Sequence, residues 1–158
     1  MSRIAQQRLV TAGARSRGLA TVEFVVTAPF ILLLLLAGAE LGRAFVQYGV
    51  LAQSVRNAAR FVSEHAINGT TGRIGLSGTV VTQATNLAVY GNVAGSGNAK
   101  LEGCCNVTVI DAGSDNIRVT ATYPYVPMIG AVLPGFGFGG GIPLEFSMRI
   151  AVTMRAIS

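Results

Sequence analysis

The chain has 158 residues, a length that suits one modest folded domain together with a membrane anchor. It is 51% hydrophobic and only 12% charged, whereas an ordinary soluble domain is about 25% charged. Its formal net charge is +5, but the excess lies in residues 1–18, because the remainder carries eight basic and seven acidic residues. A nucleic-acid partner is therefore not expected, since it would need a basic patch on the folded domain.

Residues 1–18 form a basic leader that ends at a glycine. The leader contains no acidic residue and four arginines, Arg3, Arg8, Arg15 and Arg17. A basic stretch before an apolar run is typical of a targeting signal, so we assign the leader to targeting rather than to the folded domain.

An apolar run follows the leader. Residues 24–39 contain no charged side chain, and counting from Leu19 gives 21 residues, or about 31 Å of helix. That length spans a bilayer core of about 30 Å, so we predict a transmembrane helix over residues 19–40. The arginines before it predict a cytoplasmic N-terminus and place everything after Glu40 across the membrane.

Two residues inside this segment are unusual for a simple anchor. A carboxylate such as Glu23 costs about 2.5–3.5 kcal/mol on insertion scales if it reaches the membrane centre. Glu23 therefore indicates a segment that is cut, moved or assembled. Pro29 removes one backbone donor and predicts a kink, which is either neutral or belongs to a helix that bends or partly melts when it packs in a polymer.

The helix is expected to continue beyond the membrane as an amphipathic extension over residues 41–67. Apolar residues recur at steps of three and four, at Leu41, Ala44, Phe45, Tyr48, Ala52, Val55, Ala59 and Val62. Polar residues fall largely off this stripe, at Arg43, Gln47, Gln53, Arg56 and Arg60. We predict one helix from about Thr21 to Ala66, stopped by Asn68-Gly69, whose second half needs a covering layer.

Residues 68–158 are expected to form that layer, an extracytoplasmic α/β head. A short helix is predicted over residues 79–90, ended by Gly91-Asn92. Alternating apolar residues predict a hairpin with strands at 105–110 and 117–123, and a last strand at 144–155. The predicted fold class is α+β, a long N-terminal helix packed on a small antiparallel sheet of about three strands, with one short extra helix.

The segment between the second and third predicted strands reads as an irregular loop. Residues 123–143 hold four prolines and a glycine-rich tract. Loops of this length in small domains are often functional or mobile. Phe136 and Phe138 are therefore candidates for subunit contacts, and simple packing of the loop is the alternative.

The residues needed for catalysis are missing from the sequence. The only histidine is His65, the acidic residues are scattered singly, and two cysteines do not complete a four-ligand zinc site. The glycine tract at 135–141 is not followed by Lys-Ser or Lys-Thr, so it does not predict a phosphate loop. We predict a protein that is not an enzyme and has no cofactor and no metal site.

Cys104 and Cys105 are adjacent in the sequence. Disulfides are expected in an oxidising extracytoplasmic compartment, although adjacent Cα atoms lie only about 3.8 Å apart and ordinary bridges prefer about 5.5–6 Å. Three states remain open: a strained bridge between these two neighbours, bridges between subunits, or two reduced thiols.

A family resemblance lies in the stretch R-G-L-A-T-V-E-F and the apolar run after it, then A-E-L-G-R-A and V-R-N-A-A-R-F-V, and, late in the chain, Y-P-Y-V-P. This pattern resembles the TadE-like family of the tight-adherence (Flp) pilus system. The most specific part is residues 19–62. A basic leader ending in glycine, with glutamate five residues later, is also similar to the class III signal peptide of type IV pilins and pseudopilins.

The resemblance implies a pilin-like minor subunit of a type IVb pilus. A prepilin peptidase of the inner membrane would cut between Gly18 and Leu19. Glu23, followed by the aromatic Phe24, would serve assembly by pairing with the new amino terminus of a neighbouring subunit. The implied partners are other Tad pilins, the assembly machinery and membrane lipid, with the head in the periplasm and roles in adhesion and biofilm formation.

Two alternatives give different products. Ala37-Gly38-Ala39 matches a small-x-small signal-peptidase site, and cleavage there would release a secreted chain that starts at Glu40. A single-pass membrane protein that is never cut would instead keep its whole leader.

Overall fold

The structure is a computed structural model that describes residues 4–68, 72–128, 130, 132–133 and 139–157. The side chains at 4–17, 133 and 142 lie outside this description, as do Gly69, Phe136 and Phe138. The chain divides into two compact units, Met1–Leu41 and Gly42–Ser158. The helix α1 (Ile4–His65) contributes to both units.

Helix α1 starts earlier than the sequence predicted. It begins at Ile4 rather than near Thr21, and it ends at His65, next to the predicted end at Ala66. Residues 4–17 are rich in Ala, Gln and Arg, which have high helix propensity, and the basic leader therefore joins the same helix. Pro29 lies inside α1.

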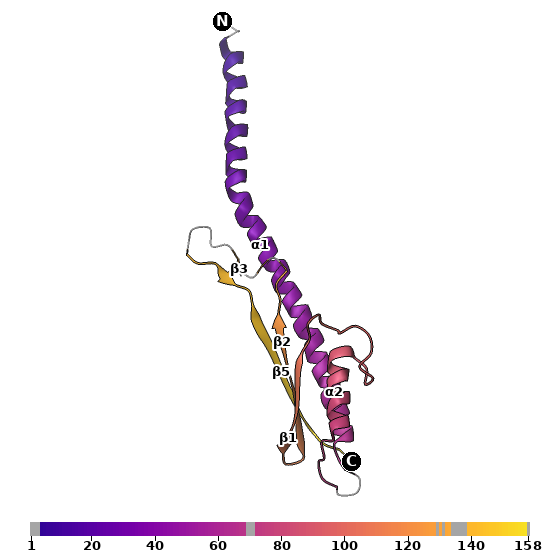
Figure 1. Ribbon diagram of the computed structural model, residues 1–158. Coiled ribbons are helices and arrows are strands. Elements are labelled where there is room, and N and C mark those ends of the chain that lie inside the picture. The colour runs from indigo at the N-terminus through magenta and orange to yellow at the C-terminus, as the bar shows by residue number, and fades with distance from the viewer. Residues whose placement is uncertain (1–3, 69–71, 129, 131, 134–138, 158) are drawn as a thin grey trace. The chain divides into compact units, whose positions relative to one another are not determined.

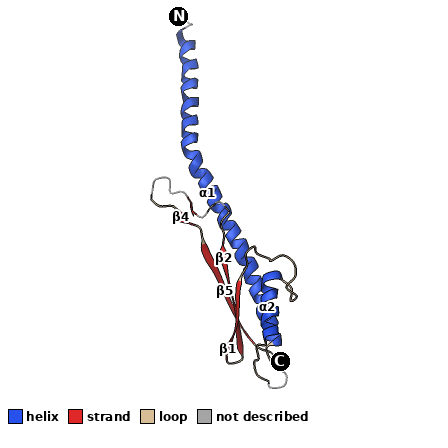
Figure 2. Cartoon of the chain, viewed as in Figure 1, coloured by secondary structure: helices blue, strands red, loops and turns tan. Residues whose placement is uncertain are grey.

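The second unit contains a three-stranded antiparallel sheet that lies along the part of α1 belonging to this unit (Figures 1 and 2). Its strands are β1 (Asn106–Gly113), β2 (Asn116–Tyr125) and β5 (Phe146–Arg155), in the order β1-β2-β5. The short helix α2 (Gly78–Tyr90) contributes its buried residues Ala84 and Ala88 to the hydrophobic core of this unit. The α+β class, with one long helix, one short helix and three main strands, is confirmed.

The second-unit part of α1 and the sheet bury one common hydrophobic core. Alternate residues of β2 are buried, as the period of two predicted, and Ile117, Val119 and Ala121 have no exposed surface. Leu51 and Val55 are the matching fully buried side chains on α1. The face of the sheet that the sequence predicted to point inward therefore packs against α1 and forms this core with it.

The predicted apolar stripe on α1 is only partly right in its first two turns, where Ala44 is buried but the other apolar members are not. Leu41, Phe45 and Tyr48 are exposed, whereas Arg43 and Gln47 are partly buried. Periodicity there predicts an apolar inner face, but Arg43 and Gln47 face the end of β2, where the Val126 carbonyl accepts a hydrogen bond from Arg43. From Leu51 onward the stripe is clear, and Gln53, Arg56 and Arg60 are exposed as predicted.

The short helix and the hairpin agree closely with their local sequence signals. Ser77 accepts a hydrogen bond from the Val80 N–H at the start of α2, and Gly91 ends it in the left-handed conformation with φ of 82°. Ser114 and Asp115 both have positive φ, at 52° and 60°, as in the type I′ turn that suits a two-residue hairpin. These local signals fixed both boundaries to within a few residues.

Strand β2 is central in the sheet although it contains Pro124. The ladder with β1 ends where Asn106 pairs with Thr122, so Pro124 has only Ser147 of β5 beside it. A proline has no N–H to donate, and an edge position is where a strand tolerates it. Tyr123 and Tyr125, on either side of the proline, remain buried against α1.

The connection between β2 and β5 is more ordered than the predicted irregular loop. Within its described part, β3 (Val132–Leu133) pairs with β4 (Ile142–Pro143) in a short antiparallel ladder. The last strand begins at Phe146 rather than Leu144, because Pro143 belongs to β4 and two residues connect β4 to β5. Phe146 is exposed and stacks on Tyr125, whereas Met148 is buried.

Two valines on the same helix provide a matched test of this core. Val55 is fully buried and Val46 is 67% exposed. Val55→Ala is expected to lower the free energy of unfolding by about 2 kcal/mol, since it removes two buried methyl groups and leaves a cavity. Val46→Ala should change it by less than about 0.5 kcal/mol. Thermal denaturation of both variants in detergent measures the difference, and equal losses would contradict the packing described here.

Candidate processing and assembly site

The residues predicted for processing and assembly lie on one continuous stretch of α1. Leu19 and Glu23 are four residues apart, so they share a helix face one turn apart. Both are exposed, as is Phe24, with Leu19 at 74% and Phe24 at 67%. A Cβ added at Gly18 would meet nothing within 4 Å. The site is therefore open to an enzyme or to a neighbouring protein.

The bond between Gly18 and Leu19 is helical, and cleavage would require its backbone to open. Proteases bind substrate backbones in extended form as an added strand, as in other β-augmentation complexes. Glycine is about 1 kcal/mol less favourable than alanine in a helix, so Gly18 lowers the cost of opening α1 at this point. A cleavage beside Gly18 would therefore need less free energy for helix opening than one beside an alanine.

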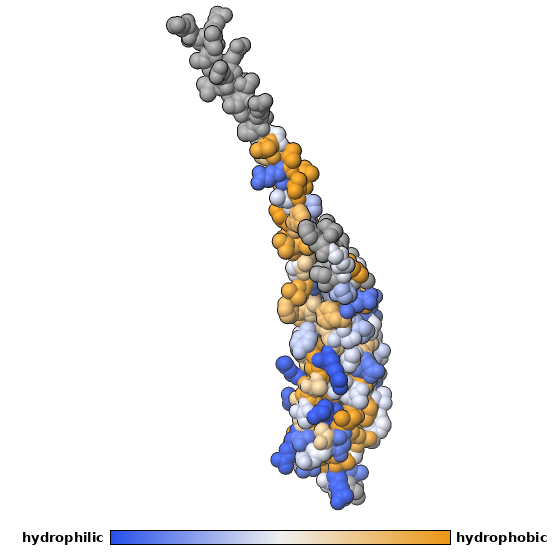
Figure 3. Space-filling model, turned by 90° about the vertical axis from the view of Figure 1, so that its left-hand side faces the viewer, coloured by the Kyte–Doolittle hydropathy of each residue, from blue (hydrophilic) through white to orange (hydrophobic). Residues whose placement is uncertain are grey.

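Beyond Glu23, α1 presents an apolar surface. Over the described residues, α1 is the one helix long and apolar enough to cross a membrane. Its most apolar stretch of 18 residues has a mean hydropathy of 2.4, and none of these residues is buried. Figure 3 shows hydrophobic side chains covering most of this stretch in the view drawn. The Thr27 hydroxyl donates to the Glu23 and Phe24 carbonyls, at 2.9 and 3.2 Å, so its polar group is satisfied within the helix. The Glu23 carboxylate is then the one charged side chain between Gly18 and Ala39.

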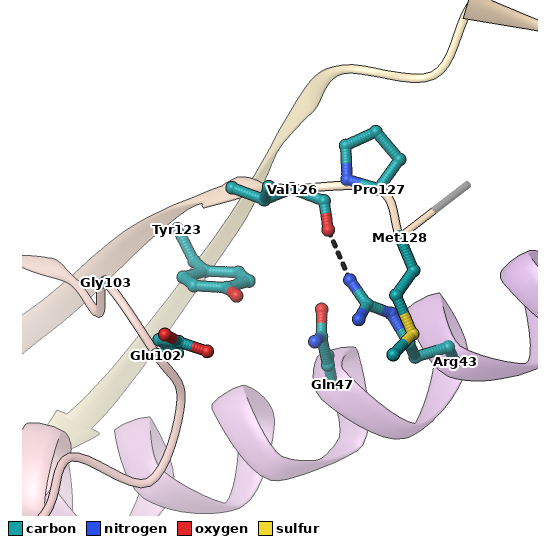
Figure 4. A pocket seen from close by; sticks show the side chains of 8 residues that line it. All are labelled: Arg43, Gln47, Glu102, Gly103, Tyr123, Val126, Pro127 and Met128. Atoms are coloured by element: carbon teal, nitrogen blue, oxygen red, sulfur yellow. Dashed lines mark hydrogen bonds between the residues drawn. The ribbon is translucent and has the colours of Figure 1, made fainter. Parts of the chain in front are cut away.

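The second unit contains a pocket that sequence reasoning missed. Its volume is about 360 Å³, and its lining comes from α1, the turn before β1 and the end of β2: Arg43, Gln47, Glu102, Gly103, Tyr123, Val126, Pro127 and Met128 (Figure 4). The Arg43 guanidinium donates to the Val126 carbonyl and lies 5.4 Å from the centre of the Tyr125 ring. Arg43 therefore ties the end of β2 to the first turn of the second unit.

Gln47 contributes an acceptor to the same pocket. Its Oε1 atom is buried and has no hydrogen-bond partner within the described part of the chain. Figure 4 shows its side chain reaching from α1 into the space between Tyr123 and Arg43. The sequence feature that could have indicated this pocket is the i, i+4 spacing of Arg43 and Gln47 directly after the apolar run. This spacing places both side chains on one helix face.

The tie made by Arg43 has a measurable consequence. Arg43→Ala removes a charge-assisted hydrogen bond to Val126 and a cation–π contact with Tyr125, and should lower the free energy of unfolding by about 1.5–3 kcal/mol. Arg56, which is exposed on the same helix, is the matched control, and Arg56→Ala should stay within about 0.5 kcal/mol of the parent. Thermal denaturation decides this, and an Arg43→Ala protein as stable as the control would show that the tie contributes nothing.

Cys104 and Cys105 lie together just before β1, in the second unit, whereas Gly18, Leu19, Glu23 and Phe24 belong to the first. The structure joins their sulfur atoms as a disulfide, and both residues are partly buried against the core. The bridge remains a prediction. Alkylation of the unreduced protein should leave both thiols unlabelled, and intact mass should be lower by two hydrogens; labelled thiols or disulfide-linked dimers would select the other two states.

Comparison with known proteins agrees with the N-terminal motifs. Residues 18–60 match the model of the TadE-like protein family. No curated protein and no solved structure matches the chain. The matched stretch starts at Gly18, includes Glu23 and extends beyond Gln47. Residues 18–60 are thus TadE-like, as the sequence motifs indicated.

Proposed function

We propose that this chain is a non-catalytic, pilin-like subunit, a pseudopilin, that supports the assembly of Tad pili. Its class III signal peptide, residues 1–18, is removed by an inner-membrane prepilin peptidase, and the mature chain starts at Leu19. The observation that carries this proposal is the exposed membrane-length helix with a single carboxylate one turn after Leu19, inside the TadE-like stretch.

The proposed role of Glu23 follows from its cost in lipid. Cleavage after Gly18 creates an amino group on Leu19, which is positively charged at neutral pH. An isolated buried carboxylate is expensive, and a close opposite charge offsets that cost. The amino group of one subunit and Glu23 of its neighbour form such a pair, so the apolar helices associate only when the leader is gone and the partner is present.

The proposed topology places the N-terminus in the cytoplasm and the second unit in the periplasm. Arginines concentrate before the apolar run, as the positive-inside rule requires. In this arrangement the β-covered head remains outside the inner membrane and enters the pilus when the helix is extracted from lipid. The partners are the peptidase, other Tad pilins and the assembly machinery, and the cellular outcomes are adhesion and biofilm formation.

The N-terminus of the protein in the membrane fraction tests this proposal. Intact mass and N-terminal sequencing should give a chain that starts at Leu19. A chain starting at Glu40 in the soluble fraction would identify a secreted protein, and a chain that keeps residues 1–18 would identify an uncut single-pass protein. Either of these results would contradict the pilin-like maturation.

A further inference from the structure

The connection between β2 and β5 has an unusual composition. Residues 126–144 include no charged, hydroxyl or amide side chain and consist only of Gly, Pro, Ala, Val, Leu, Ile, Met and Phe. Three described residues of this connection expose large apolar side chains: Val126 at 63%, Met128 at 79% and Val132 at 54%. Clustered exposed apolar side chains mark contacts with protein or lipid.

The root of this connection is held at a defined distance from the apolar run. Arg43 binds the Val126 carbonyl, and Arg43 lies only four residues after Ala39 on the same helix. Four residues correspond to about 6 Å of helix. This limit follows from the chain connection alone and holds at any angle between the two units.

That distance matches the depth of the lipid headgroup layer. The hydrocarbon core of a bilayer is about 30 Å thick and the whole bilayer about 40–45 Å, so each headgroup layer is about 5–8 Å thick. If residues 24–39 fill the core, the Arg43 backbone lies within or at the edge of that layer, and the Val126 carbonyl lies one hydrogen-bonded arginine side chain away from it. Phe45 and Val46, which follow on α1, are also exposed and apolar.

We propose that Val126, Met128 and Val132 form a membrane-contact surface that inserts into the headgroup layer beside the transmembrane helix. This proposal depends on the proposed membrane span. Lipid fits better than a protein partner because the connection has no side-chain donor or acceptor with which to recognise a protein. Its backbone groups keep it at the interface, since lipid-exposed irregular backbone is not tolerated in the hydrocarbon core. The surface would hold the head against the membrane until assembly draws the subunit out.

Tryptophan fluorescence tests the contact, because the chain contains no tryptophan. Met128→Trp, Leu34→Trp and Ile110→Trp are made separately in the full chain and reconstituted into phosphatidylcholine vesicles, with and without lipids brominated along their acyl chains. Leu34 reports on the proposed span, and Ile110, which is exposed on β1, reports on the far part of the head. Val132→Trp is a second probe of the contact surface, and circular dichroism shows whether each variant is folded.

If this surface lies in the headgroup layer, the Met128→Trp and Val132→Trp variants should show blue-shifted emission. Bromines near the glycerol end of the acyl chains should quench about half of that emission. Leu34→Trp should be quenched more strongly by bromines near the methyl end, and Ile110→Trp should be unaffected. If Leu34→Trp is quenched while both surface probes behave like Ile110→Trp, the membrane contact is overturned and the span stands. The membrane contact would also be overturned if the emission of the two surface probes is not quenched by bromine and its blue shift grows with the number of protein chains per vesicle. That result would indicate contact with a second copy of the chain. An unquenched Leu34→Trp would contradict the proposed span, and the contact with it.

Discussion

Gly18→Val is expected to leave residues 1–18 attached to the chain. Valine adds a branched side chain next to the scissile bond, where glycine has none, and a peptidase that selects glycine at this position would exclude it. No described atom lies within 4 Å of the added Cβ, so the variant should fold normally. Intact mass of the membrane-fraction protein should show an almost complete loss of the chain that starts at Leu19.

Gly38→Val is the matched control for that experiment. Gly38 is on the same helix, and a Cβ there also meets nothing within 4 Å. Its chain should be processed as well as the parent. Ala39→Leu adds a test of the secreted alternative, because it removes the small residue before Glu40 that a signal peptidase would need. Normal removal of the leader from Gly18→Val would rule out Gly18 as the processing determinant.

Glu23→Val is expected to abolish pilus assembly while membrane insertion is retained. Removing the carboxylate makes insertion more favourable by about 2.5–3.5 kcal/mol at the membrane centre, so loss of the protein from the membrane is not expected. The variant has no partner for the amino group of Leu19 on a neighbouring subunit, and that charge would remain unpaired in an apolar environment. Electron microscopy of cells producing the variant, with immunoblotting of the membrane fraction, measures both effects.

Two further variants separate the charge of Glu23 from other causes. Glu23→Asp keeps a carboxylate on the same helix face and should retain part of the assembly. Glu64→Val removes an exposed carboxylate that pairs with Arg60 at 3.0 Å near the end of α1, and it should leave pili intact, since exposed pairs are worth at most about 1 kcal/mol. Normal piliation with Glu23→Val would disprove the pairing role.

The sequence by itself determined the elements whose signals are local. A long charge-free run predicted the apolar helix, alternation predicted the buried face of β2, and Gly91 marked the end of α2. These signals work because helix and strand periods, caps and turns depend on neighbouring residues. The residues of the candidate processing site could also be named from the sequence. Gly18, Leu19, Glu23 and Phe24 belong to one continuous motif, which falls within the TadE-like stretch.

The tertiary structure alone decided which face of α1 meets the sheet. Leu41, Phe45 and Tyr48 fit the expected stripe and are exposed, whereas Arg43 and Gln47 turn toward the end of β2 and line a pocket. The pairing of β3 with β4 and the tie between Arg43 and Val126 likewise join residues distant in sequence. Sequence periodicity cannot specify such contacts, because the group that a side chain such as Arg43 meets is set only when segments distant in sequence pack together.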